Sequence, residues 1–366
     1  MRSDNPGFVP DSPFSKQLPE EWLQFFKTFP KLELHCHLLG TIGKETFEEL
    51  VVESGADVSQ EDINNFYTRG EKPIGVLRIF RCLESKVLSN PSFLTRITLK
   101  HIQRVASQGV KYIEFYWNWT GLKHFMSYDE ARQAVNEGII QGLQRYGVVA
   151  RSIPSIDRED TPEAAIELVE EMIKYPDKYT IGLGIDYRET NHEPEKFWKA
   201  FKIAKEAGFK ITIHAGEFGE HWRNVETAMK LLGADRIDHG YTIIDNPKLV
   251  EEAKAADMHF AVVPTNSYYL RTMSDEEWAL KHPVRKMVEF GLKIFPNSDD
   301  PTMHHISISE SWLLMHNWLD FTLPQLRKML ENSIEAAWVS SEQKAVWKKE
   351  WLAEFDRLAS ALPPIS

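Results

Sequence analysis

Short apolar segments alternate with longer amphipathic segments through most of this 366-residue chain. Some of the short segments, such as 211–214, are almost continuously apolar, which is typical of parallel strands buried on both faces. Longer segments such as 161–174 repeat their apolar residues with helical spacing. We expect eight strands, at Leu32–His35, Tyr112–Tyr116, Val148–Ile156, Ile181–Ile185, Ile211–His214, Arg236–His239, Phe260–Val263 and Lys293–Pro296.

This alternation of strands and helices predicts an α/β fold with a parallel sheet. Eight such units over roughly 270 residues favour a closed (β/α)₈ barrel of the TIM type, whose usual size is ~250 residues. An open, doubly wound sheet is the alternative, but its Gly-x-Gly-x-x-Gly turn does not follow the first expected strand. We therefore expect a single domain, residues 1–366, with the barrel at about 30–305.

Two segments exceed the barrel pattern. Residues 41–99, between the first two strands, are too long for one crossover helix and predict a helical insertion that covers the mouth of the barrel. The tail at about 306–362 is also predicted to be helical. Its tryptophans are expected to pack in the core, because aromatic side chains dominate cores; they are Trp312, Trp318, Trp338, Trp347 and Trp351.

Composition narrows the class of protein. The net charge of −11 disfavours nucleic acid as a partner, because an acidic chain repels phosphate. The two cysteines, Cys36 and Cys82, exclude a disulfide framework and fit a reducing compartment. No apolar run approaches bilayer length, and the N-terminus from Met1 to Ser15 is polar. We expect a cytoplasmic protein that does not bind a membrane.

Polar residues recur at the carboxyl ends of the expected strands. His35 and His37 end the first strand, and residues i and i+2 of a strand share a face, so both imidazoles can reach one point. In a barrel, all these ends open on one catalytic face. The other strand ends carry Asp186, His214 with Glu217, Asp238 with His239, and Asp299 with Asp300.

These residue types predict a metal-dependent hydrolase. The imidazoles of His35, His37 and His214 with the Asp299 carboxylate suit one zinc ion per chain with a position open for water, and Fe²⁺ or Mn²⁺ also fits. Bound zinc lowers the pKa of water to about 7. His239 is expected to orient or deprotonate that water, and Glu217 to protonate the substrate.

Four motifs follow one another along the chain: Pro30-Lys-Leu-Glu-Leu-His-Cys-His-Leu38, His214-Ala-Gly-Glu217, Arg236-Ile-Asp-His-Gly240 and Asn297-Ser-Asp-Asp-Pro301. Together they resemble the adenosine/adenine deaminase family, which implies a zinc-dependent aminohydrolase on a (β/α)₈ barrel. The resemblance implies His35, His37, His214 and Asp299 as zinc ligands. It also implies Glu217 as donor to the purine ring nitrogen, His239 as the residue handling water, and Asp300 as partner of the purine imidazole nitrogen.

The resemblance to this family favours adenine, or a modified adenine, over adenosine as the small-molecule substrate. Adenosine deaminases usually carry an Asp where this chain has Leu39, and that Asp helps hold ribose. Glu189 and Asp238 match the adenine type, and we expect both, with Gly216, to contact the purine. Adenosine deamination is the second hypothesis. An amidohydrolase cleaving an amide or ester is the third, and a non-catalytic purine-binding barrel is the fourth.

Two segments depart from the adenine deaminase pattern. They are Tyr116-Trp-Asn-Trp119 after the second strand and Thr302-Met-His-His305 after the eighth. An altered pocket is therefore expected around Trp117, Trp119, His304 and His305. The alternative for the two tryptophans is packing in the barrel or lid.

Overall fold

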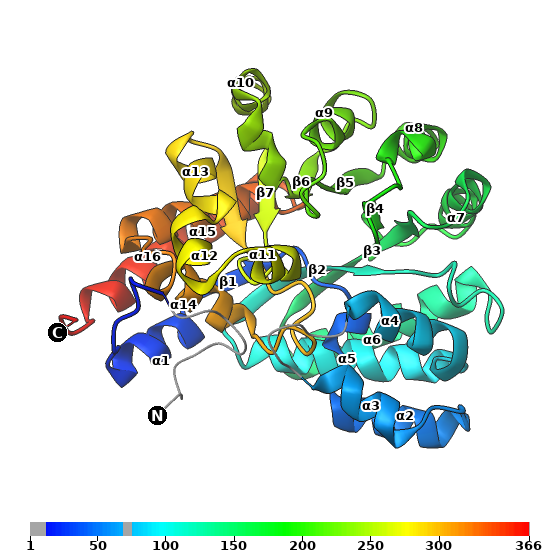
Figure 1. Ribbon diagram of the computed structural model, residues 1–366. Coiled ribbons are helices and arrows are strands. Elements are labelled where there is room, and N and C mark those ends of the chain that lie inside the picture. The colour runs from blue at the N-terminus through cyan, green and yellow to red at the C-terminus, as the bar shows by residue number, and fades with distance from the viewer. Residues whose placement is uncertain (1–11, 69–74, 366) are drawn as a thin grey trace.

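The computed structural model describes residues 12–68 and 75–365. Its eight strands are all parallel and follow one another in chain order around the sheet (Figure 1). The predicted (β/α)₈ barrel is therefore confirmed. The strands are β1 (Lys31–Glu33), β2 (Val110–Trp117), β3 (Val149–Asp157), β4 (Gly182–Asp186), β5 (Lys210–Ala215), β6 (Arg236–His239), β7 (His259–Val262) and β8 (Lys293–Pro296).

The barrel closes through the chain that follows β1 and β8. The backbone N–H of His37 donates to the Asp299 carbonyl over 3.0 Å, and the N–H of Asp299 donates to the His35 carbonyl over 3.2 Å. Strand β1 ends two residues earlier than expected. The Leu34 N–H donates to the side-chain oxygen of Asn297 over 2.9 Å instead of to a neighbouring strand. His35 and His37 therefore lie on an extended segment just beyond the regular strand.

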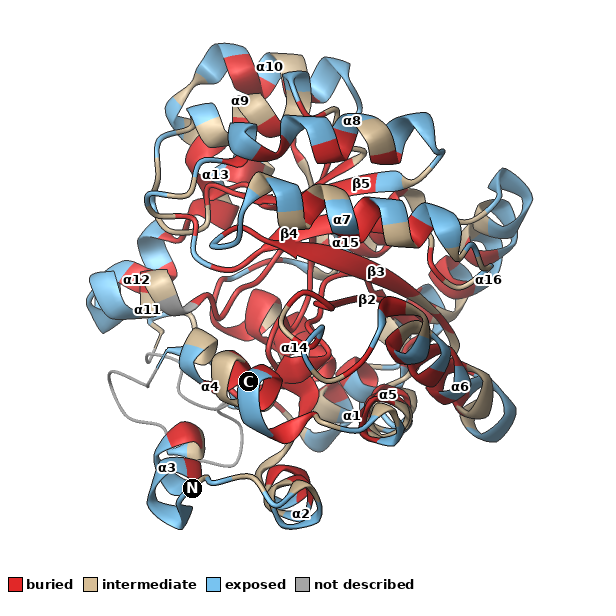
Figure 2. Cartoon of the chain, turned by 90° about the vertical axis from the view of Figure 1, so that its right-hand side faces the viewer, coloured by how far each residue is buried: buried red, intermediate tan, exposed pale blue. Residues whose placement is uncertain are grey.

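The outer helices bury one face against the strands and leave the other exposed to solvent (Figure 2). Helix α7 (Pro162–Lys174) illustrates the local signals: the Thr161 hydroxyl accepts the Ala164 N–H, and proline occupies the first turn. The other crossover helices are α6 (Tyr128–Tyr146), α8 (Trp198–Glu206), α9 (Arg223–Lys230), α10 (Pro247–Ala255) and α13 (Pro283–Glu289).

Between β1 and β2 lies the expected insertion, and it is helical where it is described. Its last helix, α5 (Pro91–Ala106), extends beyond the expected end at 99 and packs on β2 as the crossover helix. Residues 69–74 of the insertion, and residues 1–11 of the polar N-terminus, lie outside the described residues. The preceding helices are α2 (Lys44–Ser54), α3 (Gln60–Tyr67), α4 (Val76–Cys82) and a π-helical turn at Leu83–Val87.

The chain ends in three helices, α14 (Ile308–Asn317), α15 (Leu323–Ala336) and α16 (Ser341–Ser360). Four of the five tail tryptophans are buried, as predicted, and Trp338 is half-buried against the guanidinium of Arg236. Arg236 in turn pairs with Glu114 of β2 over 2.7 Å inside the barrel. No helix of the described residues is long and apolar enough to cross a membrane.

Candidate metal centre and active site

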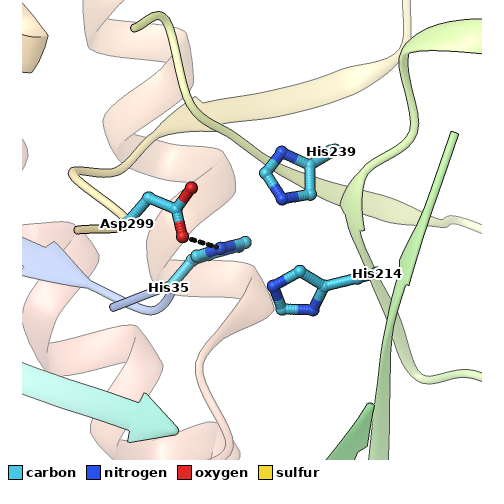
Figure 3. Close-up of side chains that lie close together, drawn as sticks. All are labelled: His35, His214, His239 and Asp299. Atoms are coloured by element: carbon cyan, nitrogen blue, oxygen red, sulfur yellow. Dashed lines mark hydrogen bonds and ion pairs between the residues drawn. The ribbon is translucent and has the colours of Figure 1, made fainter. Parts of the chain in front are cut away.

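Five potential metal ligands converge at the carboxyl ends of β1, β5, β6 and β8. His35 Nε2 lies 3.0 Å from Asp299 Oδ1, and His37 Nε2 lies 3.2 Å from the same oxygen. His37 Nε2 also lies 3.1 Å from His214 Nε2. His239 lies beside these groups, and donor atoms of His35, His214, His239 and Asp299 all fall within 4.8 Å of one another (Figure 3).

The structure thus brings together the four expected ligands and adds His239. Ligands around one tetrahedral zinc ion, at 2.0–2.1 Å from the metal, lie about 3.3 Å apart. The observed donor separations of 3.0–3.2 Å are close to that value. The centre fits a divalent metal ion.

Each of the three expected histidine ligands has a carboxylate behind it. Asp238 lies 3.4 Å from Nδ1 of His35 and 3.2 Å from Nδ1 of His214, while Asp186 lies 3.3 Å from Nδ1 of His37. A carboxylate at Nδ1 fixes the tautomer and directs Nε2 toward the metal. Carboxylates in this position are typical of the residues that surround the histidine ligands of a metal site. They are a second observation, independent of the donor distances, that the centre fits a divalent metal ion.

The electrostatics of the centre favour a cation. Burial opposes protonation of His35, but Asp299 and Asp238 outweigh it and raise its pKa to about 9. Burial would raise the pKa of Asp299, but His35 and His37 hold it well below the usual range. The carboxylates are therefore ionised, and their negative field stabilises a positive charge at this point.

Two site residues have left-handed backbones, which are uncommon outside glycine. His239 has φ 65° and Asp299 has φ 63°. Such a conformation costs on the order of 1–3 kcal/mol and persists where the surroundings hold it. The barrel-closing bonds to the Asp299 backbone supply that support for one of them. The turns aim both side chains at the centre.

Glu217 lies on the loop after β5 and faces the centre. Its Oε2 is 3.6 Å from His239 Nε2, and its Oε1 accepts from the Asn266 side-chain amide over 3.2 Å. Burial, with the negative charges of Asp299 and Glu189, raises its pKa well above the usual range. Glu217 is therefore suited to carry a transferable proton near neutral pH.

His239 has the opposite character. Burial and the neighbouring His35 hold its pKa well below the usual range. A neutral imidazole beside a metal centre can accept a proton or bind the metal. Its Nδ1 lies 3.4 Å from the Tyr241 hydroxyl, which exchanges hydrogen bonds with the backbone of Val263. These contacts orient the ring.

Three residues expected to contact the purine lie away from the pocket. The Glu189 carboxylate accepts the backbone N–H groups of Gly216, Glu217 and Phe218, so it shapes the loop that carries Glu217. Gly216 has φ 70°, and a Cβ there would come within 2.5 Å of the Thr242 hydroxyl. Asp238 is fully buried behind the histidines. The Glu189 and Asp238 carboxylates are therefore engaged by other protein groups, and contact of these residues or of the Gly216 backbone with the purine stays a prediction.

A cavity of about 480 Å³ opens above the centre. His37, His214, Glu217, Asp299 and Asp300 line it together with the expected His304. Asp300 is buried, and a Cβ on Gly40 would lie 2.0 Å from its Oδ1, so glycine is required beside it.

Trp117 and Trp119 do not line the described cavity. Trp117 stacks on Tyr128 at 5.8 Å between ring centroids, and Trp119 meets the same ring edge-on at 5.7 Å. Packing, the alternative interpretation, is therefore correct for both. His305 is exposed and does not line the cavity either.

Sequence reasoning missed Arg158 and the role of Asp186. Arg158 is buried at the end of β3 and donates to the His214 carbonyl over 2.5 Å. Its position directly after Asp157, at a strand end, carries the same signal that identified the histidines. Asp186 was noted at a strand end, but only the structure reveals its contact with His37.

Replacing Asp238 by Asn is expected to weaken metal binding by about 10- to 100-fold, because Asp238 orients two of the histidines. Titration of the metal-free protein with zinc and a competing chelator would measure the change. Asp235→Asn is a suitable control, since Asp235 lies near the opposite end of β6 and pairs with Lys210. An unchanged affinity in Asp238→Asn would show that the carboxylate does not support the ligands.

Comparison with known proteins agrees with this geometry. The family model for adenosine deaminase matches residues 30–350. An adenine deaminase from Marinomonas sp. (strain MWYL1) is 26% identical over 92% of this chain and 99% of its own. An adenosine deaminase from Clostridium botulinum (strain Loch Maree / Type A3) is 28% identical over 88% and 97%. A zinc-bound amidohydrolase from Burkholderia ambifaria has a TM-score of 0.95 and 45% identity, covering 96% of this chain and 97% of that one.

The barrel and its histidine–carboxylate centre define the class first: a hydrolase with a metal-dependent amidohydrolase fold. The family match then narrows the class. The chain belongs to the adenosine deaminase family, and it is a hydrolytic deaminase. The two curated relatives act on different purines by name and are nearly equally similar to this chain, so the family assignment leaves the substrate to be argued from the pocket.

Proposed function

We propose that this chain is a single-domain, zinc-dependent aminohydrolase that acts at C6 of an adenine-type purine. Water supplies the oxygen that bonds to C6, the C6–N bond breaks, and ammonia leaves. The observation that carries this proposal is the position of Glu217, whose carboxyl group lies beside the metal centre, 3.6 Å from His239. Its raised pKa allows it to act there as a proton donor. An enzyme that only cleaves an amide or ester has no need of a proton at a ring nitrogen.

His35, His37, His214 and Asp299 are the proposed zinc ligands. Three nitrogens and one oxygen are a donor set that zinc accepts, with a position left for water. The ion would act as a Lewis acid that makes water a stronger nucleophile. The zinc-bound amidohydrolase with 45% identity supports zinc over iron or manganese.

The protein's own residues would move the protons. Glu217 gives its proton to the ring nitrogen beside C6, which makes that carbon a better electrophile. His239, neutral and 3.6 Å from Glu217, accepts a proton from water. Asp300, on the cavity wall, is the proposed partner of the purine imidazole nitrogen. Arg158, Glu189 and Asp238 hold these groups in place.

Adenine or a close relative is the first proposed substrate, and adenosine is the second. Leu39 is buried and apolar, so it offers no hydrogen bond to a ribose at the position where adenosine deaminases usually have Asp. A site that lacks a polar partner loses discrimination for the group it would bind.

A substrate panel tests this proposal. The zinc-loaded protein is incubated with adenine, adenosine, deoxyadenosine, AMP and N6-substituted purines, and ammonia and the ultraviolet spectrum are followed. At least one 6-aminopurine is expected to react with kcat/KM of about 10⁴ M⁻¹s⁻¹ or more. If none releases ammonia, the proposed reaction is wrong. If adenosine alone reacts, the reaction stands and the argument from Leu39 is wrong.

A further inference from the structure

Charges around the cavity are divided between its base and its rim. The carboxylates that line it are Glu217, Asp299 and Asp300, which lie at the base beside the metal centre. The rim carries the guanidinium groups of three exposed arginines from three separate elements: Arg78 from α4, Arg188 from the loop after β4, and Arg271 from α11 (Ser267–Thr272). A net charge of −11 does not predict this concentration of positive charge.

Arg78 and Arg188 have few carboxylate partners among the described residues. Arg188 Nε lies 3.6 Å from Glu159, but Glu159 also pairs with Arg81 over 3.0 Å. Arg81 also contacts Asp157 and Glu84, and the Arg188 side chain remains 60% exposed. Among the described residues, no carboxylate lies within ion-pair distance of Arg78. The guanidinium groups of Arg78 and Arg188 are therefore available to an anion at the part of the opening that the structure describes.

A purine bound for deamination would direct one particular atom toward this rim. C6 must lie at the base, near the metal centre and Glu217. C6 and N9 lie at opposite ends of the purine, so N9 and any substituent on it point outward. The cavity of about 480 Å³ lies within the ~300–1,000 Å³ range of sites for larger ligands, so a bare base leaves space toward the arginines.

We propose that the natural substrate is a 6-aminopurine that carries an anionic group, a phosphate or a carboxylate, on its N9 substituent. This inference rests on the proposed deamination. Arg78, Arg188 and Arg271 bind the anion, since planar guanidinium groups match both oxyanions with paired hydrogen bonds. An apolar residue at position 39 agrees with this proposal, because the arginines at the rim, rather than a hydrogen bond to ribose, would select the N9 substituent.

The test compares neutral and anionic substrates on the zinc-loaded protein. Values of kcat/KM are measured for adenine, adenosine, AMP and adenosine 5′-carboxylic acid. One of the two anionic nucleosides is expected to exceed adenosine by about tenfold or more, and its KM is expected to rise with ionic strength. Preference for AMP assigns a phosphate, and preference for the carboxylic acid assigns a carboxylate.

Variants at the rim give a second readout. In Arg78→Gln and in Arg188→Gln, the ratio of kcat/KM for the anionic substrate to that for adenosine is expected to fall by about tenfold. A ratio within one variant is insensitive to the amount of folded protein. Arg357→Gln is the matched control and should keep the ratio unchanged, because Arg357 lies on α16 and pairs with Glu354 three residues earlier.

The outcomes separate this inference from the proposed function. If adenine or adenosine reacts as well as both anionic nucleosides, or the rim variants keep the wild-type ratio, the anion inference is overturned and deamination stands. If no 6-aminopurine releases ammonia, the deaminase proposal fails and the inference falls with it.

Discussion

Glu217→Gln is expected to lower the deamination rate by about 10²- to 10⁴-fold, the usual contribution of a general acid. Glutamine preserves the shape of the side chain and its contact with Asn266 but has no proton to give to a ring nitrogen. Burial is the main reason that Glu217 holds a proton, and Glu189 adds to it. The negative charge of Asp299 also raises the pKa of Glu217. A metal ion bound to Asp299 would offset that contribution, whereas the effect of burial would persist.

Ammonia release in a single turnover is the measurement, with metal content and melting temperature taken on the same preparation. Metal content should stay near that of the wild type, because Glu217 is not among the proposed ligands. Glu206→Gln, at an exposed position on α8, controls for loss of a carboxylate and should keep full activity. Wild-type turnover in Glu217→Gln would exclude the proton-donor role.

The pH profile gives a separate check on the same residue. The reaction needs Glu217 protonated, so kcat/KM should fall as pH rises through its raised pKa. That alkaline limb should be missing in Glu217→Gln, whose residual activity does not depend on this proton.

Local patterns were sufficient to locate the strands and the residues that converge at the candidate metal centre. The bounds of β6 and β8 match the prediction at both ends, and both strands are short. His35 and His37 were identified by their spacing of two, and the structure keeps them together even though β1 ends at Glu33. Extended chain beyond a strand retains the same alternation of side chains.

The direction of each polar side chain was less predictable. Asp238 and His239 are adjacent in a strand and should face opposite ways, yet both face the centre. The left-handed backbone of His239 turns its side chain inward, and no local sequence pattern predicts that backbone conformation. Asp238 therefore supports the histidines from behind, where sequence reasoning placed it at the purine.

Contacts between distant segments were also beyond the sequence. Glu189 holds the backbone of the loop that carries Glu217, a contact that depends on how β4 and β5 pair. The rim arginines come from residues 78, 188 and 271 and share no motif. Only the folded barrel brings their guanidinium groups to one opening.

His214→Ala is expected to abolish stoichiometric metal binding and to lower deamination by about 10³-fold or more, because it removes one of three nitrogen ligands. His214 also contacts His37 through Nε2 and Asp238 through Nδ1, so its loss disturbs His37 as well. Metal content after dialysis and ammonia release are the measurements. His124→Ala, at an exposed histidine outside the centre, should change neither.

The same variant links the metal to stability. Zinc at 100 times its dissociation constant should raise the unfolding free energy of the metal-free wild type by about 2.7 kcal/mol, and this gain should vanish in His214→Ala.

His239→Ala separates the two roles open to that imidazole. If His239 handles water, the variant loses activity but keeps the metal and the stabilisation, whereas His37→Ala loses both. Full metal content in His214→Ala and His37→Ala would mean that the cation binds elsewhere.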